Sequence, residues 1–420
     1  MKITRRNFLK SAAVVAGTAA LLPAATPDRT RAKQVTKTEL DRILDRPVLK
    51  LDFATSPVVV ESVELLRNGE TYLLRTRARG GLEVVTVPHP VRMAQGYPVF
   101  LKNILPVFIG KDARTLEALL WEVYRHGSNY KLQGLALWPG VAAIEMALLE
   151  LLGHATGRPL ADFFGGAVRR DIPVYYASGN RGNTPEAEIE HLQKLVAGSG
   201  VRAIKFRLGG RMSRNEDFPP RRTDQLVPLV RKTFGDGMTL YGDANSSYDV
   251  PEGIRIGRLL EAHGYGFYEE PCPFDHLWET KEVADALTLP VAGGEQEYSL
   301  RNFQWMIEHR GVDIVQPDLH YGGGLIRATK VARMAAAAGM TVVPHMSGGG
   351  LGYVDVVQFA AFTPNIGPFM EFKGNAKFPV ACDTSSLKCE NGIVRCPTGP
   401  GWGLKVDPHF VKVAKPVSFS

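Results

Sequence analysis

Cysteine is scarce in this chain of 420 residues, and the spacing of the few cysteines excludes two kinds of site. The chain has four, at Cys272, Cys382, Cys389 and Cys396. None of them forms a CxxC pair, which zinc knuckles and thioredoxin-like redox sites require. Metal or redox chemistry based on thiols is therefore not expected.

Nucleotide-binding loops are missing as well. No GxGxxG turn follows a first strand, which disfavours an open doubly wound sheet. Two glycine-rich stretches, 321–325 and 347–352, lack the Lys-Ser/Thr of a P-loop. We interpret both as tight turns at strand ends.

Basic charge is also sparse once the N-terminus is set aside. The formal net charge is +7, but residues 1–32 hold six basic residues and one acidic residue. Cleavage near Ala32 would leave about +2, so the basic character belongs mainly to the leader. A nucleic-acid partner would need a basic face on the folded part, and we expect none.

The N-terminus itself is typical of a twin-arginine export signal. Thr4–Lys10 reads TRRNFLK and precedes an apolar run, Ser11–Leu22, that is too short to span a bilayer. We expect export by the twin-arginine translocase to the periplasm or beyond, without stable membrane insertion; an uncleaved membrane anchor is the alternative. Because such proteins fold in the reducing cytoplasm, the cysteines are expected to be free.

The signal (1–32) and a disordered linker (33–45) precede a small α+β domain at 46–170. Apolar clusters around Asn68-Gly69 and Gly80-Gly81 predict a three-stranded antiparallel meander with a tight first hairpin. Helical periodicity follows at 115–127 and 141–157. A tail at 378–420, with its own Asn-Gly turn, is expected to pack back on this domain.

Residues 171–377 alternate apolar strands with helical segments. Eight strands are expected, and almost every one ends in a polar or charged residue: IPVYYAS, RAIKFRL, MTLYGDA, GYGFYEE, LPVAGGE, VDIVQPD, MTVVPHM and PFMEF. Eight repeats with functional strand ends predict an α/β TIM-type barrel, whose chemistry lies where its strands end.

Three strand-end acids, Asp243, Glu269 and Glu295, are separated by 26 residues each, the length of one strand, one helix and two loops. Carboxylates with this spacing should meet on neighbouring parallel strands. As hard oxygen ligands they predict a Mg²⁺ site. The alternative is three independent acids that cap helices or pair with arginines.

Residues at three more strand ends suggest a general base and a binding site for the substrate carboxylate. Asp318 and His345 lie 27 residues apart, and a carboxylate beside an imidazole makes a general base for neutral pH; a buried structural histidine is the alternative. Lys205 and Arg207 alternate onto one face of their strand, where two cations suit a substrate carboxylate. An exposed basic pair is the other interpretation.

The motifs KxR, DAN, EEP, GGE, QPD, PH and ME, in this order, resemble the mandelate racemase and muconate lactonizing branch of the enolase superfamily. The resemblance covers nearly the whole mature chain. It implies a (β/α)₇β barrel with an α+β capping domain formed by the N-terminal region and the tail. It also implies Mg²⁺ held by an Asp-Glu-Glu set, with Glu269 rather than Glu270 as the ligand in EEP, and proton abstraction next to a carboxylate.

The resemblance also assigns roles to single residues. Glu371 would hydrogen-bond the substrate carboxylate, and Asn245 and His320 are expected substrate contacts. Arg207 departs from the family's racemases and epimerases, which carry Lys there as a second base. One base suits a dehydratase of a sugar acid, in which His345 removes the α-proton and the β-hydroxyl leaves, giving a 2-keto-3-deoxy acid.

Alternatives remain open at this point. A racemase, epimerase or cycloisomerase could use Lys205 as its second base. A non-catalytic sugar-acid binding protein would have lost a ligand or the Asp-His pair, and neither is lost. The family also implies a homo-oligomer. With the tight hairpin at Asn68-Gly69, selectivity is expected from 93–97 or His320-Tyr321.

Overall fold

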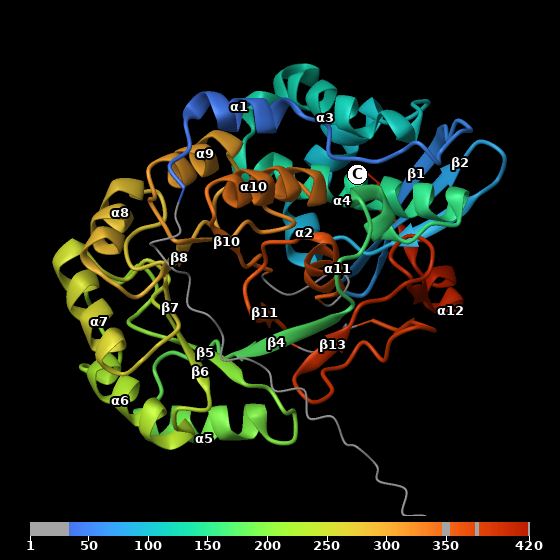
Figure 1. The fold of residues 1–420 in the computed structure, drawn as a ribbon. Helices are drawn as coiled ribbons and strands as arrows, with labels where there is room; N and C mark the ends of the chain where they lie inside the picture. The colour runs from blue at the N-terminus through green and yellow to red at the C-terminus, as the bar shows by residue number, and fades with distance from the viewer. Residues whose placement is uncertain (1–32, 347–352, 374–377, 419–420) are drawn as a thin grey trace, which may run out of the picture.

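A computed structural model describes residues 33–346, 353–373 and 378–418 (Figure 1). The export signal at 1–32 and the glycine-rich stretch 347–352 lie outside the described residues. The other glycine-rich stretch forms the predicted turn, with Gly323 and Gly324 at φ values of 89° and 107° that favour glycine.

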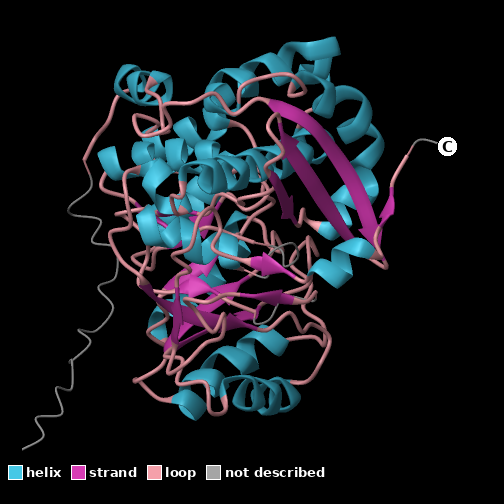
Figure 2. Cartoon of the chain, turned by 90° about the vertical axis from the view of Figure 1, so that its right-hand side faces the viewer, coloured by secondary structure: helices cyan, strands magenta, loops and turns pink. Residues whose placement is uncertain are grey.

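The capping domain contains the predicted meander, whose long strands stand apart from the barrel strands (Figure 2). Strands β1 (Val60–Asn68), β2 (Thr71–Ala78) and β3 (Glu83–Thr86) are antiparallel neighbours. Asn68 pairs with Thr71 across a two-residue turn that begins at Gly69, with φ +60°. From the tail, β15 (Lys415–Pro416) joins the free edge of β1, which confirms that the tail reaches this domain.

The capping domain also contains the α-helices α2 (Pro90–Val99), α3 (Leu116–Arg125) and α4 (Gly134–Thr156). The second and third confirm the predicted periodic segments, and α4 ends at Gly157 in the left-handed conformation. By length and composition α4 could cross a membrane, but 83% of its most apolar window is buried inside the fold. It is therefore the core helix of this domain.

The barrel follows, with helices outside and strands inside. Its strands are β4 (Asp171–Ala177), β5 (Ala203–Arg207), β6 (Thr239–Asp243), β7 (Phe267–Glu269), β8 (Val291–Gly293), β9 (Ile314–Val315), β10 (Thr341–Val342) and β11 (Met370–Glu371). The helices between them are α5 (Pro185–Val196), α6 (Arg222–Phe234), α7 (Val250–Ala262), α8 (Leu277–Ala286), α9 (Leu300–Glu308), α10 (Leu325–Ala337) and α11 (Val354–Phe362).

All eight strands are parallel neighbours in the order β10-β9-β8-β7-β6-β5-β4-β11. A parallel bridge between Val342 and Ile366 links the two ends of this order. The predicted (β/α)₇β topology is confirmed, and the carboxyl ends of all strands meet at one mouth.

The linker prediction was wrong for residues 37–45. They form helix α1 (Lys37–Asp45), which packs against α9 and α10. The sequence held the signal for it, because Thr36 and Glu39 make a reciprocal capping box. Side chains also tie the helix to the barrel, since Lys330 donates to the carbonyl oxygen of Leu44 at 2.6 Å.

The tail packs on the barrel as well as on the capping domain, which the sequence did not indicate. Strand β13 (Ile393–Arg395) pairs antiparallel with β4. The remaining elements are β12 (Val380–Ala381), β14 (Lys405–Val406) and α12 (Pro408–Lys412). All four cysteines are free, as expected.

Candidate active site

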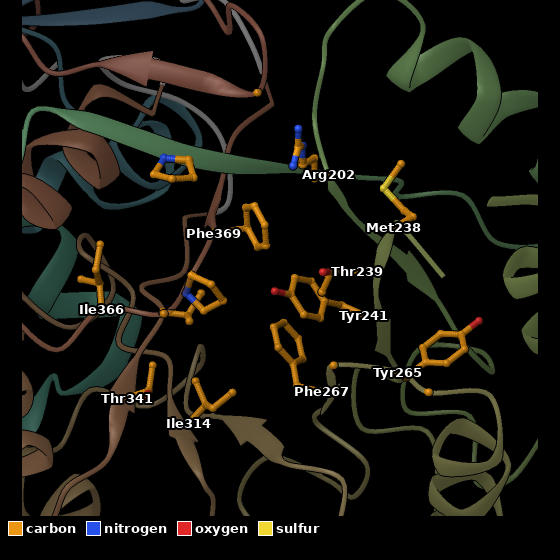
Figure 3. A pocket seen from close by; sticks show the side chains of 18 of the residues that line it. Arg202, Met238, Thr239, Tyr241, Tyr265, Phe267, Ile314, Thr341, Ile366 and Phe369 are labelled. Carbon is orange, nitrogen blue, oxygen red and sulfur yellow. The ribbon is translucent and has the colours of Figure 1, made fainter. Parts of the chain in front are cut away.

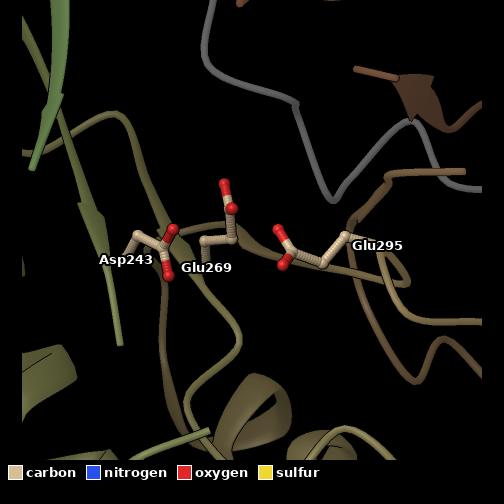
Figure 4. Close-up of side chains that lie close together, drawn as sticks. All are labelled: Asp243, Glu269 and Glu295. Carbon is tan, nitrogen blue, oxygen red and sulfur yellow. The ribbon is translucent and has the colours of Figure 1, made fainter. Parts of the chain in front are cut away.

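Three carboxylates lie together at the mouth of the barrel (Figure 4). Asp243 ends β6 and is the direct register partner of Glu269, which ends β7. Glu295 lies two residues beyond β8, after Gly294 turns the chain with φ +109°. One oxygen from each of the three lies within 4.8 Å of the others, and all three residues are buried.

Two cations face these acids from β5. Lys205 Nζ donates to both oxygens of Glu269, at 2.7 and 2.9 Å, and lies 3.7 Å from Asp243. Arg207 is the register partner of Asp243 and forms an ion pair with it. Gln316, at the end of β9, donates to Glu269 at 2.9 Å. The expected alternation of Lys205 and Arg207 onto one face therefore holds.

The three carboxylates fit a hard divalent cation. They supply only oxygen donors, and Oε2 of Glu295 is buried without a hydrogen-bond partner among the described residues. A buried carboxylate oxygen without a donor is costly, and a cation would satisfy it. Their roles as ligands remain a prediction.

The pKa values of neighbouring acids diverge here. Burial alone would raise the pKa of Glu269, but Lys205 and Arg207 lower it below the ordinary value. Burial, together with the charges of Glu295 and Glu269, raises the pKa of Glu270 well above its ordinary value. These directions favour Glu269 over Glu270 as the predicted cation ligand of the EEP motif.

The predicted histidine–aspartate pair forms beyond the ends of β9 and β10. Asp318 and His345 form a parallel bridge, and His345 Nδ1 donates to Asp318 Oδ2 at 2.7 Å. Asp318 Oδ1 accepts from the backbone amides of His320 and Tyr321, both at 2.7 Å. His345 Nε2 lies 3.4 Å from Glu295 Oε2. The ring is thus fixed with its second nitrogen at the acid cluster.

His345 favours its protonated form more than a free histidine does. Burial lowers its pKa, but Glu295 and Asp318 more than offset this and raise the pKa above the ordinary value. Asp318 responds in the opposite direction: burial raises its pKa, while the hydrogen bond from His345 lowers it overall. The imidazole of His345 can therefore both accept and return a proton.

The expected substrate contacts have partners of their own. The ring of His320 is 1% exposed and bonds Asp355 of α11 at 2.6 Å. The backbone amide of Asn245 donates to Asp243 Oδ1 at 2.8 Å, so Asn245 borders the acid cluster. Contact of either side chain with a substrate stays a prediction.

Glu371 ends β11 and completes the ring of strand-end acids. It lies 3.6 Å from Lys205 and 2.7 Å from Lys373. Burial raises its pKa, but the two lysines lower it far below the ordinary value. Its expected hydrogen bond to a substrate carboxylate is not tested by this arrangement and also remains a prediction.

Sequence reasoning missed three polar residues at the mouth: Arg181, Gln316 and Lys373. Gln316 and Lys373 follow the rule that strand ends carry the site, so the QPD and MEFK motifs held a signal for them. Arg181 lies in the loop after β4 and donates to Asn245 Oδ1. No spacing rule points to it, because the loop places it.

A cavity of about 660 Å³ opens at the opposite end of the barrel, where the strands begin (Figure 3). Apolar and aromatic side chains such as Tyr241, Phe267 and Phe369 line it. None of the candidate catalytic residues does. The chemistry of the strand ends is therefore separate from this cavity.

Comparison with known families decides the assignment. Residues 187–410, more than half of the chain, match the family described as enolase C-terminal domain-like. The chain belongs to this family. It is an enzyme of the enolase superfamily, in the branch of mandelate racemase and muconate lactonizing enzyme.

Relatives of this enolase-superfamily enzyme extend over most of its length. An arabinonate dehydratase of Saccharolobus solfataricus is 26% identical over 73% of this chain and 79% of its own. A D-galactarolactone cycloisomerase of Agrobacterium fabrum is 29% identical over 71% and 79%. A mandelate racemase/muconate lactonizing protein of Paracoccus denitrificans, solved with magnesium, is 26% identical with a TM-score of 0.76, covering 86% and 99%.

The N-terminus has its own match. Residues 2–21 match the twin-arginine translocation signal sequence. The enzyme is therefore exported by the twin-arginine pathway, to the periplasm or beyond.

Proposed function

We propose that this enzyme is a Mg²⁺-dependent dehydratase of a sugar acid, an aldonate or aldarate, that releases a 2-keto-3-deoxy acid. The Asp318–His345 pair carries the proposal, because it directs one ring nitrogen at the acid cluster. The superfamily assignment and the relatives named as dehydratases support this reaction class.

The residues of the site fall into two groups: those that would hold the metal ion and the substrate, and those that would transfer the proton. Asp243, Glu269 and Glu295 would hold Mg²⁺, which supplies electrophilic stabilisation for the negative charge that develops on the substrate carboxylate. Lys205 and Arg207 offset part of the negative charge of these acids, and they would help to orient a substrate carboxylate bound beside them. The burial of both cations strengthens this interaction.

Proton transfer belongs to His345. With Asp318 accepting from Nδ1, the neutral ring presents a lone pair at Nε2 and removes the α-proton of the substrate. The electron pair of the broken C–H bond moves into the carboxylate, giving an enediolate. The imidazolium then returns the proton to the β-hydroxyl, which leaves as water, and the resulting enol becomes the 2-keto acid.

A library of aldonic and aldaric acids, incubated with the protein and Mg²⁺, tests the proposal. A 2-keto acid detected with semicarbazide is the expected result for at least one member. The His345→Asn variant serves as the matched control and should give none. Absence of product across a broad library, while the protein binds Mg²⁺, would refute the proposal.

The isomerase alternative uses Lys205 as a second base, and the relative named as a cycloisomerase favours it. Against it, the Lys205 ammonium is bonded to both oxygens of Glu269. An epimer or lactone formed without loss of water would establish this alternative.

A further inference from the structure

Arg181 is a cation at the mouth that the proposed mechanism does not use. It is half-buried in the loop between β4 and α5, and its Nη2 donates to Asn245 Oδ1. Its Nε is buried and has no hydrogen-bond partner among the described residues. Among the described residues, no carboxylate forms an ion pair with Arg181.

The charges that act on Arg181 come mainly from other guanidinium groups, and Glu295 is the acid that opposes them. Burial, and then the charges of Arg207, Arg211 and Arg222, lower the pKa of Arg181 to about 9. Nε of Arg207 is also buried without a hydrogen-bond partner among the described residues. Asp243 pairs with Arg207, and Glu188 lies 3.9 Å from Arg222. Of these three guanidinium groups, those of Arg181, Arg207 and Arg222, the first is the one without a carboxylate partner among the described residues, and a bound anion would compensate its charge.

The guanidinium group of Arg181 borders the acid cluster. The backbone amide of Asn245, whose side chain accepts from Arg181, donates to Asp243 at 2.8 Å. Asn245 follows Asp243 by two residues, so their Cα atoms lie within about 7.6 Å. His345 reaches the cluster from β10, beside Glu295. Arg181 therefore lies on the Asp243 side of the acid cluster, whereas His345 reaches the cluster on the Glu295 side.

The loop after β5 closes this side of the mouth. The amide of Met212 donates to the carbonyl of Asn245 at 3.1 Å, and that of Asn215 to Ser247 at 2.8 Å. These bonds hold the loop with Arg211 over the segment that Arg181 contacts. Two segments distant in sequence thus bring guanidinium groups to one place.

We infer that Arg181 forms a subsite for a second carboxylate of the substrate. The substrate is then an aldarate, a sugar diacid, rather than an aldonate; this inference rests on the proposed function. A planar guanidinium binds a carboxylate with two parallel hydrogen bonds. A neutral terminal CH₂OH group leaves the Arg181 guanidinium uncompensated.

The test compares diacids with monoacids of the same configuration: galactarate with galactonate, and glucarate with gluconate. Wild type should show the higher kcat/KM for a diacid. Arg181→Gln should lower the diacid-to-monoacid ratio about 30-fold, because a charge-assisted hydrogen bond is lost. Arg181→Lys, which keeps the charge but not the planar fork, should lower it less. Arg214→Gln, an exposed arginine of the nearby loop, is the matched charge control and should not alter the ratio.

Titration calorimetry of glucarate and gluconate separates this inference from the proposed function. Tighter binding of the diacid, lost in Arg181→Gln, supports the subsite even if no sugar acid is turned over. Preference for monoacids, a ratio unchanged in Arg181→Gln, or preference for a terminally phosphorylated aldonate such as 6-phosphogluconate would overturn it.

Discussion

Two histidine–aspartate pairs lie next to each other in this enzyme, and they differ in where the second ring nitrogen is directed. In the His345–Asp318 pair, Nε2 lies 3.4 Å from Glu295. In the His320–Asp355 pair, Nδ1 is buried with no hydrogen-bond partner among the described residues. The same two residue types therefore form the proposed proton-transfer group at the mouth and a buried link between a loop and α11.

The two pairs are connected through Asp318. One oxygen of Asp318 bonds the ring of His345, and the other accepts the backbone amide of His320. The link between His320 and Asp355 thus helps to hold the loop that orients the base. The comparison predicts that one pair governs turnover and the other governs stability.

The largest expected effect separates the pairs by activity. His345→Asn should lower kcat about 10³-fold, because the proton acceptor is lost. His320→Asn should lower it about tenfold or less, because it acts only through the orientation of Asp318. Steady-state assays on the best substrate measure both; equal losses would abolish the distinction.

Stability should show the reverse order. His320→Asn leaves the fully buried Asp355 without its imidazole partner and should cost about 3 kcal/mol of unfolding free energy. His345→Asn should cost about 1 kcal/mol, since Asp318 keeps two amide donors. Urea denaturation followed by circular dichroism gives both values. A more stable His320→Asn than His345→Asn protein would contradict the assignment.

The pH dependence of stability is a further test of the His320–Asp355 pair. Burial lowers the pKa of His320, but Asp355 and Asp318 raise it above the ordinary value of about 6.5. The folded state therefore holds this proton more tightly than the unfolded state does. The resulting stability is fully present below about pH 6.5 and is lost as pH rises through the folded pKa. The stability gap between wild type and His320→Asn should thus be wider at pH 6 than at pH 9; a gap that widens at pH 9 would show the opposite linkage.

The smallest expected effect concerns the residue beside both pairs. The ring of Tyr321 lies 6.3 Å from that of His345, and its hydroxyl accepts from Arg92 of α2 at 2.8 Å. Tyr321→Phe removes only this bond to the capping domain and should cost about 1 kcal/mol, with a few-fold rise in KM. Kinetics with unchanged kcat are expected; a loss as large as that of His345→Asn would place Tyr321 in the chemistry.

Much of the site can be predicted from the spacing of strand-end residues in the sequence. Asp243 and Glu269 could be paired from their spacing, because one helical crossover returns the chain to the neighbouring strand at the same height. Asp318 and His345 meet for the same reason. Glu295 meets Asp243 and Glu269 although it lies beyond the end of β8. The spacing alone does not reveal that β8 ends before Glu295.

Loops and helix starts were less accessible to sequence reasoning. Asp355 lies in the first turn of α11, where an acid usually serves the helix itself, and nothing in the sequence identifies His320 as its partner. Arg181 reaches Asn245 only through the conformation of its loop. Helix α1 was wrongly predicted to be part of a linker, although the sequence contains its capping box.

The central claim is that one base, His345, removes the α-proton and water then leaves. The most direct test is mass spectrometry of the reaction in D₂O on the substrate found by the library. The account predicts a 2-keto acid that has lost water and carries solvent deuterium at C3. Deuterium at C2 of a recovered epimer, without loss of water, would contradict it.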